Sequence, residues 1–438
     1  MMSVRFDLKT ASFLKKEVNR MADIISGKSR FGGGASFGNK KVIRLVSEPE
    51  KNDNLDEAEI KNRVMNRRKR IAVIIVVSVA VIIAAVFALL YFMDGITYSD
   101  YSVVQSINRD DSETASYIGY ADGYVRYSND GIAYYSKKGT SVWNQTYTMQ
   151  KPQVKICGDT LAVGDINGSK IYVFDKSGNL GVIDTSLAIS QIEVANQGVV
   201  AAVLEDNDAN YINLYDEDGT KIYTVKTSLS GDGYPLDISI SPDATKLMAS
   251  YLYVSGETMK TNVVFYNFSE VGQNETERVV GGFNHYDSTI VGDVHFMNEN
   301  TAVAVGENIV SIYSIKEYPK LSKEITIDNE IDRVFFGSGY IGLVLKNSDS
   351  GDIYRMVVYN TGGNKVCETT FSTQYDSIVF DGKSIVMSSD TAFVLMNLKG
   401  KKLAELTMSL PIQTVIPVGR RGDYICVNSK YVQNIRLK

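Results

Sequence analysis

A repeated strand unit in residues 94–438 constrains the fold more than any other feature of this sequence. Each copy is an alternating apolar segment, then Asp, Asn or Ser, two further residues, and Gly. A short polar side chain can cap a turn and Gly adopts the left-handed conformation readily, so the unit is typical of a β-hairpin. Five clear copies occupy residues 133–139, 171–178, 212–219, 357–363 and 393–400.

The spacing of the copies indicates how many units the chain holds. The polar turn residues stand at positions 136, 175, 216, 360 and 397, which gives intervals of 39, 41, 144 and 37 residues. The long interval divides into three units of 48, and two weaker copies at 263–267 and 310–314 fill it. A further 37 residues lead to Asn434. Eight copies at a period of this size predict a radial array.

An all-β, eight-bladed β-propeller is the fold that this array predicts. A single four-stranded sheet cannot bury both of its faces, so neighbouring sheets pack on one another and close into a ring. The expected blades are 116–150, 151–186, 187–228, 234–284, 288–328, 329–373, 374–410 and 411–438.

The last expected blade is too short, because it has room for three strands only. A strand-like segment from Tyr98 to Ile107 belongs to no complete unit. We predict that this segment supplies the missing outer strand and closes the ring. The alternative is a seven-bladed ring with irregular flanks.

A long apolar stretch precedes the repeats, from Ile71 to Met93, and contains no charged residue. As a helix rising about 1.5 Å per residue it would reach about 34 Å, enough to cross a hydrocarbon core of about 30 Å. We therefore predict a single transmembrane helix over 71–93, between a tail (1–70) and an outer domain (94–438). The basic residues that flank its start are Arg67, Arg68, Lys69 and Arg70.

The charge balance orients this helix. Residues 1–70 hold 17 Lys and Arg against 9 Asp and Glu, whereas the remainder holds 29 against 42. By the positive-inside rule, the tail is expected in the cytoplasm and residues 94–438 outside the cell membrane. The acidic balance of the outer domain also opposes binding to nucleic acid.

The tail is expected to be partly helical and partly disordered. Residues 10–25 have apolar side chains at helical spacing with basic ones between them, which predicts an amphipathic helix. This helix would dock on the inner leaflet or on a cytoplasmic partner; the alternative is a transient helix without a partner. A Gly-rich run (31–39) and an acidic stretch (48–56) read as a linker, and residues 55–70 favour a helix that continues into the span.

Few residues in the chain suit catalysis or cofactor binding. The only histidines are His285 and His295, and the three cysteines lie far apart in the sequence. This composition disfavours His-based catalysis, a disulfide framework and a zinc site. We assign no catalytic, cofactor or metal residue. The acidic turns at 165–168, 206–208 and 216–219 leave weak calcium binding as a minor alternative to ordinary turn chemistry.

Tyrosine is the most conspicuous aromatic residue, with 27 copies against one tryptophan. Tyr side chains suit interfaces and sugar stacking, so a cluster of them is a candidate binding surface. The alternative is cross-strand packing within the blades. The candidate cluster consists of Tyr117, Tyr120, Tyr124 and Tyr127.

Two segments resemble the repeats of quinoprotein-like and WD40-like propellers, namely IYVFDKSGN (171–179) and ISISPDATKLMAS (238–250). The whole arrangement is similar to a family of bacterial propeller proteins with a single membrane anchor. The resemblance implies the fold and carries no activity with it. The chain also departs from the enzymes and repeats of this class, because its only tryptophan, Trp143, is followed by Asn144.

These observations favour a non-catalytic scaffold that is anchored in the membrane and docks another protein of the cell envelope. The alternative is an extracytoplasmic sensor that binds a saccharide or peptide and signals through the helix. An enzyme is the least favoured class, and no cofactor is expected.

Overall fold

The computed structural model of the chain describes residues 57–110, 114–229, 231–286, 289–347, 351–419 and 421–438. The expected amphipathic helix over 10–25 and the linker lie outside the described residues. The chain forms two compact units, Met1–Gly95 and Ile96–Lys438, and each is described here by itself.

In the first unit, α2 (Glu57–Asp94) is one helix of 38 residues. It joins the helix expected over 55–70 to the apolar stretch that follows. Within the described ranges, no helix combines the length and the apolarity that crossing a membrane requires. The membrane span over 71–93 stays a prediction.

The second unit consists of eight four-stranded antiparallel sheets, which are the blades of a propeller. Blade 1 has β2 (Ser116–Tyr120), β3 (Gly123–Ser128), β4 (Gly131–Ser136) and β5 (Ser141–Thr146). Blade 2 has β6 (Pro152–Cys157), β7 (Thr160–Asp165), β8 (Lys170–Asp175) and β9 (Gly178–Asp184). Blade 3 has β10 (Ala188–Val194), β11 (Val200–Glu205), β12 (Ala209–Tyr215) and β13 (Lys221–Ser228). Blade 4 has β14 (Tyr234–Ile240), β15 (Lys246–Ser255), β16 (Thr258–Asn267) and β17 (Val279–Tyr286).

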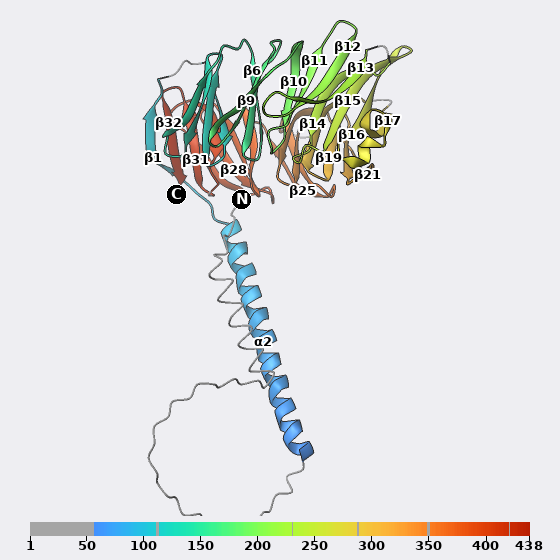
Figure 1. Ribbon diagram of the computed structural model, residues 1–438. Coiled ribbons are helices and arrows are strands. Elements are labelled where there is room, and N and C mark those ends of the chain that lie inside the picture. Colours follow the sequence, from blue (N-terminus) through green and yellow to red (C-terminus); the bar gives the residue numbers. More distant parts are fainter. Residues whose placement is uncertain (1–56, 111–113, 230, 287–288, 348–350, 420) are drawn as a thin grey trace, which may run out of the picture. The chain divides into compact units, whose positions relative to one another are not determined.

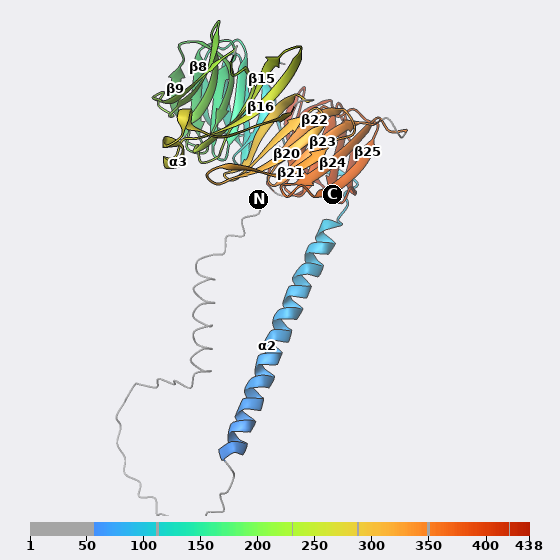
Figure 2. The ribbon, with the colours of Figure 1, turned by 90° about the vertical axis from the view of Figure 1, so that its right-hand side faces the viewer.

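The other four blades follow in chain order. Blade 5 has β18 (Val291–Asn298), β19 (Thr301–Gly306), β20 (Ile309–Ile315) and β21 (Pro319–Thr326). Blade 6 has β22 (Ile331–Gly337), β23 (Tyr340–Lys346), β24 (Tyr354–Asn360) and β25 (Lys365–Phe371), which lie side by side in Figure 2. Blade 7 has β26 (Ser377–Asp381), β27 (Ser384–Ser389), β28 (Ala392–Asn397) and β29 (Lys402–Thr407). Blade 8 has β30 (Ile412–Pro417), β31 (Asp423–Asn428), β32 (Tyr431–Leu437) and β1 (Tyr101–Asn108).

The predicted closing strand is confirmed. β1 pairs antiparallel with β32, from Tyr101 opposite Leu437 to Asn108 opposite Tyr431, and becomes the outer strand of blade 8. Figure 1 shows β1 beside β32 at the edge of the ring. Blade 8 also packs on blade 1, because Tyr124 shares a hydrophobic cluster with residues of β30, β31 and β32. The ring therefore has eight blades, and the seven-bladed alternative is wrong.

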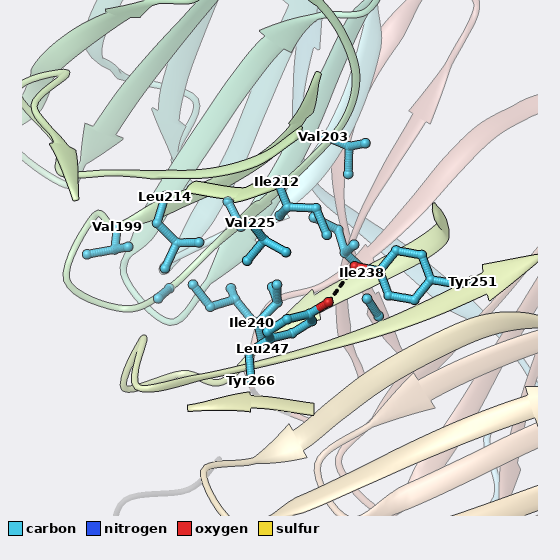
Figure 3. Packing of buried hydrophobic residues seen from close by; sticks show 13 residues of the cluster. Val199, Val203, Ile212, Leu214, Val225, Ile238, Ile240, Leu247, Tyr251 and Tyr266 are labelled. Carbon is cyan, nitrogen blue, oxygen red and sulfur yellow. Dashed lines mark hydrogen bonds between the residues drawn. The ribbon is translucent and has the colours of Figure 1, made fainter. Parts of the chain in front are cut away.

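Apolar side chains from facing sheets fill the spaces between adjacent blades. Between blades 3 and 4, for example, Leu214 and Val225 of one sheet meet Ile240 and Leu247 of the next. Figure 3 shows this cluster, in which the hydroxyls of Tyr251 and its β16 neighbour Tyr266 lie 2.9 Å apart. The described residues of all eight hydrophobic clusters lie between Tyr98 and Leu437. Residues 96–438 thus hold all the described strands and hydrophobic clusters of the ring, so we expect this unit to fold on its own.

The turns have the chemistry that the repeat predicts. Asp175 Oδ1 accepts hydrogen bonds from the backbone N–H groups of Ser177 (2.7 Å) and Gly178 (3.1 Å). Gly178 has a φ of 136°, where a side chain would be strained. In the acidic turn at 216–219, Asp216 Oδ1 accepts from the N–H of Glu217 (2.9 Å) and Asp218 Oδ1 accepts from that of Thr220 (2.8 Å). Asp165 Oδ1 instead accepts from the N–H groups of Gln150 and Lys151, both at 2.9 Å, in the segment that leads into blade 2. Among the described residues, no group of His, Cys, Asp and Glu is placed to hold a metal ion.

The propeller has two faces, which we name by where the chain joins it. The proximal face is the one at which the inner strand of each blade ends. The chain enters the propeller at this face, where the N–H of Tyr98 donates to the carbonyl of Leu403 (2.6 Å) at the start of β29. The distal face holds the turns between the second and third strands. The proximal face of blade 4 also carries α3 (Glu270–Gln273) and the 3-10 helix η1 (Thr276–Arg278), which the strand pattern did not predict.

Candidate functional site

The inner strands of the blades surround a central channel, and a cavity of about 600 Å³ opens in it. Its walls come from blades that are far apart in the sequence, which identifies it as part of the channel. The lining includes residues 117–121 of blade 1, Ile156 of blade 2, Phe380 of blade 7 and residues 414–417 of blade 8. This cavity has the size of a small-ligand site. Aromatic residues stand in its lining, but polar atoms contribute more of the exposed wall than apolar atoms do.

Tyr120 anchors one wall of this cavity. Its hydroxyl donates to the carbonyl of Asp159 at 2.6 Å, and its ring packs edge-on against Tyr134 with centroids 5.0 Å apart. Burial raises the pKa of Tyr120 above its ordinary value, and the nearby Asp175 and Asp159 carboxylates add to the shift. The phenol therefore stays protonated at physiological pH and serves as a fixed, neutral donor.

Arginine and tyrosine side chains form an array where blade 1 meets blade 8, at the point where the ring closes. The Arg109 guanidinium lies 5.1 Å from the centre of the Tyr117 ring, and that of Arg126 lies 5.4 Å from the Tyr135 ring. Tyr124 stacks on Tyr135 at 5.2 Å with 12° between the ring planes. The array surrounds a smaller cavity of about 160 Å³. Cation–π contacts of this kind attract the guanidinium groups to the rings.

The structure brings together three of the four predicted tyrosines. Tyr117 lines both cavities, Tyr120 lines the larger and Tyr124 the smaller. Tyr127 lies elsewhere, against the hydrophobic cluster between blades 1 and 2. Their role in binding stays a prediction. The basic residues Arg67 to Arg70 lie in α2 with exposed side chains.

The inner strands of blades 2 to 5 carry a polar cluster that the sequence reading missed. It consists of Lys155 on β6, Glu193 on β10, Asp237 on β14, and Asp293 and His295 on β18. The signal was present in the sequence, because each is a charged or titratable residue within an otherwise apolar inner strand. The sequence does not show that these residues come together in space, because cluster members on successive blades stand 38 to 56 positions apart.

Specific contacts join this cluster across the blades. The Lys155 ammonium pairs with the Glu193 carboxylate. Asp237 Oδ2 accepts a hydrogen bond from the N–H of Val294 at 2.8 Å, which ties β14 to β18. The ring of His295 stacks on Phe336 with centroids 4.3 Å apart. These contacts join the inner strand of blade 2 to that of blade 3, and the inner strand of blade 5 to those of blades 4 and 6.

Burial sets the protonation states within the cluster. It raises the pKa of Asp237 to about 7, with help from the charges of Asp293 and Glu193, and it also raises the pKa of those two carboxyls. Burial lowers the pKa of His295 to about 4, and the Lys155 charge adds to this. For Lys155 burial acts to lower the pKa, but the Glu193 carboxylate outweighs it and the pKa rises. At neutral pH the cluster therefore holds one cation, a neutral imidazole and, in Asp237, a carboxyl close to its own pKa.

Nucleophilic chemistry finds little support in the described residues. Cys157, Cys367 and Cys426 are free thiols. Burial raises the pKa of all three, that of Cys426 to about 12, so the reactive thiolate is disfavoured.

We expect Asp237→Asn to stabilise the propeller at pH 8 and to have little effect at pH 5. An acid whose pKa is raised by folding stabilises the native state fully below its unfolded pKa, near 4, and this contribution is lost as the pH rises through about 7. Three pKa units correspond to about 4 kcal/mol. Solvent screening of this partly exposed group reduces the expected gain in unfolding free energy to roughly 1–2 kcal/mol.

Urea unfolding of both proteins at the two pH values measures this difference. Asp206→Asn makes the same chemical change in an exposed distal turn and serves as the matched control. If wild type and Asp237→Asn were equally stable at pH 8, the raised pKa of Asp237 in the folded protein would be contradicted.

Several solved structures are similar to this chain. The crystal structure of Saccharomyces cerevisiae Sqt1 has a TM-score of 0.51 at 11% identity, covering 78% of this chain and 99% of Sqt1. Porphyromonas gingivalis dipeptidyl peptidase 4 has a TM-score of 0.53 at 14% identity, covering 74% of this chain and 58% of the peptidase. The chain thus spans little more than half the length of that enzyme. The WD40 domain of Neurospora crassa Pan2 has a TM-score of 0.40 at 8% identity, covering 65% of this chain and 88% of that domain.

At these identities the first two likenesses show the β-propeller fold and nothing more. No curated protein sequence matches the chain. One family does match, over residues 94–437, and it is described as "Family of unknown function (DUF5711)". The match begins just after the apolar stretch and includes β1 as well as β32, so it covers the whole closed ring. The chain therefore belongs to the DUF5711 family.

Proposed function

We propose that this protein is a non-catalytic, membrane-anchored scaffold whose propeller docks another protein of the cell envelope. In this proposal residues 71–93 of α2 cross the cell membrane, residues 94–438 lie outside, and the basic tail contacts lipid or a partner inside.

The observation that carries this proposal is an exposed apolar hairpin on the distal face. β15 and β16 are both ten residues long, and their tip extends beyond Tyr234, where β14 begins opposite Leu252. At the tip Val254 and Met259 stand opposite each other and are 73% and 60% exposed. A projecting apolar pair on a rigid blade suits insertion into an apolar groove of a partner protein.

The membrane part of the proposal rests on the sequence and surface of α2. The side chains of residues 71–85 are exposed, including Val76 at 68%. A helix with apolar residues on all sides needs an apolar environment, and lipid provides one. The basic run from Arg67 to Arg70 favours the cytoplasmic side for the preceding residues.

We expect the double substitution V254D/M259D to remove the docked partner without unfolding the ring. Two charges at the tip cannot enter an apolar groove, whereas exposed positions tolerate them with stability changes of about 0.5 kcal/mol. The measurement is cross-linking mass spectrometry of the full chain in its native membranes. Lys260, beside Met259, supplies an amine for the cross-linker.

The matched control is V142D/I222D, which places the same charges at two positions on outer strands, each 50% exposed. The proposal predicts that cross-links from Lys260 to an envelope protein survive in this control and disappear in V254D/M259D. Cross-links that persist unchanged in both variants would exclude the hairpin as the docking element.

The cavity in the channel favours a second candidate, the extracytoplasmic sensor. Its aromatic walls, with Tyr117 and Phe380, suit a saccharide or an apolar peptide side chain. A thermal-shift screen with cell-wall saccharides and peptides tests this function, because a ligand at 100 times its Kd adds about 2.7 kcal/mol of stability. A shift that Tyr117→Ala abolishes would support the sensor over the scaffold.

A further inference from the structure

The turns on the proximal face divide into two sectors of opposite charge. These turns join the first strand to the second and the third to the fourth in each blade. In blades 3 to 5 their described residues include nine acids and two bases. The acids are Asp216, Glu217, Asp218, Asp243, Glu270, Glu275, Glu277, Glu299 and Glu317, and the bases are Arg278 and Lys316. We call this set the acidic sector.

Across the ring, the proximal turns of blades 7, 8 and 1 are basic. Their described residues include six bases and one acid, Asp122. The bases are Lys137, Lys138, Lys383, Lys399, Lys401 and Arg421, and all five lysines are exposed. We call this set the basic sector. Blades 2 and 6 separate the two sectors, since Asp159 and Lys176 of blade 2 pair at 2.7 Å and the blade 6 turns carry no charge.

A groove between blades 8 and 1 gives the basic sector a binding cavity. Its volume is about 440 Å³, and its lining includes Lys137, Lys138, Arg436 and Val104. The only carboxylate in the lining, Asp423, accepts two hydrogen bonds from Arg436, at 2.6 and 2.9 Å. Because Arg436 balances Asp423, the charges of Lys137 and Lys138 give the lining of the groove a net positive charge. Val104 is 60% exposed and provides an apolar wall.

The basic sector is also where the chain joins the propeller. Tyr98 bridges to Ala404 of blade 7, and the next strand, β1, forms a wall of the groove through Val104 and Gln105. The chain therefore enters the ring in this sector. The acidic sector lies on the other side of the ring, away from this point.

We infer that the groove and the basic sector bind anionic phospholipid headgroups at the surface of the bilayer. This inference rests on the proposed membrane anchoring. Lysine ammonium groups attract lipid phosphates, each contributing about 1 kcal/mol near an anionic surface. The exposed Val104 suits the apolar boundary below the headgroups. The acidic sector is repelled by the same surface, so blades 3 to 5 are turned away from it.

Vesicle flotation of residues 96–438 tests this inference without the anchor. At low salt the unit should float with vesicles in which a third of the lipid is phosphatidylglycerol and the rest phosphatidylcholine. It should not float with pure phosphatidylcholine, and high salt should release it. K137E/K138E should weaken binding at least ~20-fold, because each lysine contributes about fivefold. K151E/K430E, with the same change in net charge on exposed distal turns, should bind like the wild type.

Two outcomes would overturn the inference: equal flotation with both vesicle types, or equal losses in the two charge-reversal variants. Glycerol 1-phosphate separates the two sources of phosphate. If it binds the unit in calorimetry while anionic vesicles do not, the groove is a site for free phosphate esters and the lipid inference fails.

A second arm uses the full chain in nanodiscs and keeps the scaffold proposal separate. Amide exchange in residues 137–140 and 398–401 should slow in discs with phosphatidylglycerol relative to phosphatidylcholine discs. Unchanged exchange in these turns, with Lys260 still cross-linking to a protein partner, rejects the lipid site alone. Slower exchange without any such cross-link rejects the docking scaffold alone.

Discussion

Deleting residues 96–108 should abolish the cooperative unfolding of the ring, the largest effect that we expect. The deletion removes β1, leaves β32 as an open edge and exposes the cluster that Tyr98 and Tyr101 cover. Without the strand that closes the ring, the free energy of unfolding should fall by more than about 5 kcal/mol, which is comparable to the whole stability of many domains. Thermal unfolding followed by circular dichroism measures the loss. Size-exclusion chromatography should show association through the open edge.

A synthetic peptide of residues 96–110 provides the control for this deletion. Added to the truncated propeller, it should pair with β32 and restore a cooperative transition. A truncated propeller that unfolds like the intact unit would show that β1 does not close the ring.

Lys155→Met should have the second-largest effect, a loss of about 2–3 kcal/mol in unfolding free energy at neutral pH. The substitution keeps the length of the side chain but leaves the carboxylates of Glu193, Asp237 and Asp293 without their cation. Breaking a fully buried pair costs 3–5 kcal/mol. We expect less here because the Lys155 side chain is 36% exposed. Urea unfolding measures the difference.

The pH dependence of this loss identifies its cause. Burial raises the pKa of all three carboxyls, so they gain protons as the pH falls and the missing cation matters less. The deficit of Lys155→Met should therefore shrink at pH 5, and K155M/E193Q should recover part of it at pH 7. Lys170→Met breaks an exposed pair with Asp184 (2.5 Å) and should leave the unfolding free energy nearly unchanged. A deficit that is equal at both pH values would point to lost packing instead.

The architecture could be predicted from the sequence because it depends on local signals that recur. Asp175 and Asn397 mark their turns by bonding to the backbone within four residues, and this chemistry is visible in a short segment. The closing strand was predictable for a different reason. The segment from Tyr98 to Ile107 belonged to no blade, and the blade at 411–438 had one strand too few. Placing that segment in that blade was the simplest solution.

The sites were less predictable, because they depend on residues that the ring brings together from distant segments. Lys155 and Glu193 meet across a blade boundary, and no local pattern encodes that contact. Tyr127 was grouped with its neighbours in sequence, but it packs between blades 1 and 2 while Tyr117 and Tyr120 line the channel. The charge sectors became visible only once the topology had assigned each turn to a face.

The closure of blade 8 also governs the order of events when the chain is made. β1 is synthesised first and β32 last, and the hydroxyl of Ser102 contacts the carbonyl of Arg436 across 334 positions. At about 5–20 residues per second, β1 waits on the order of 20–70 s for its partner. Until then seven blades must hold together as an open arc with two unpaired edges. The nascent propeller is therefore most exposed to aggregation just before β32 emerges.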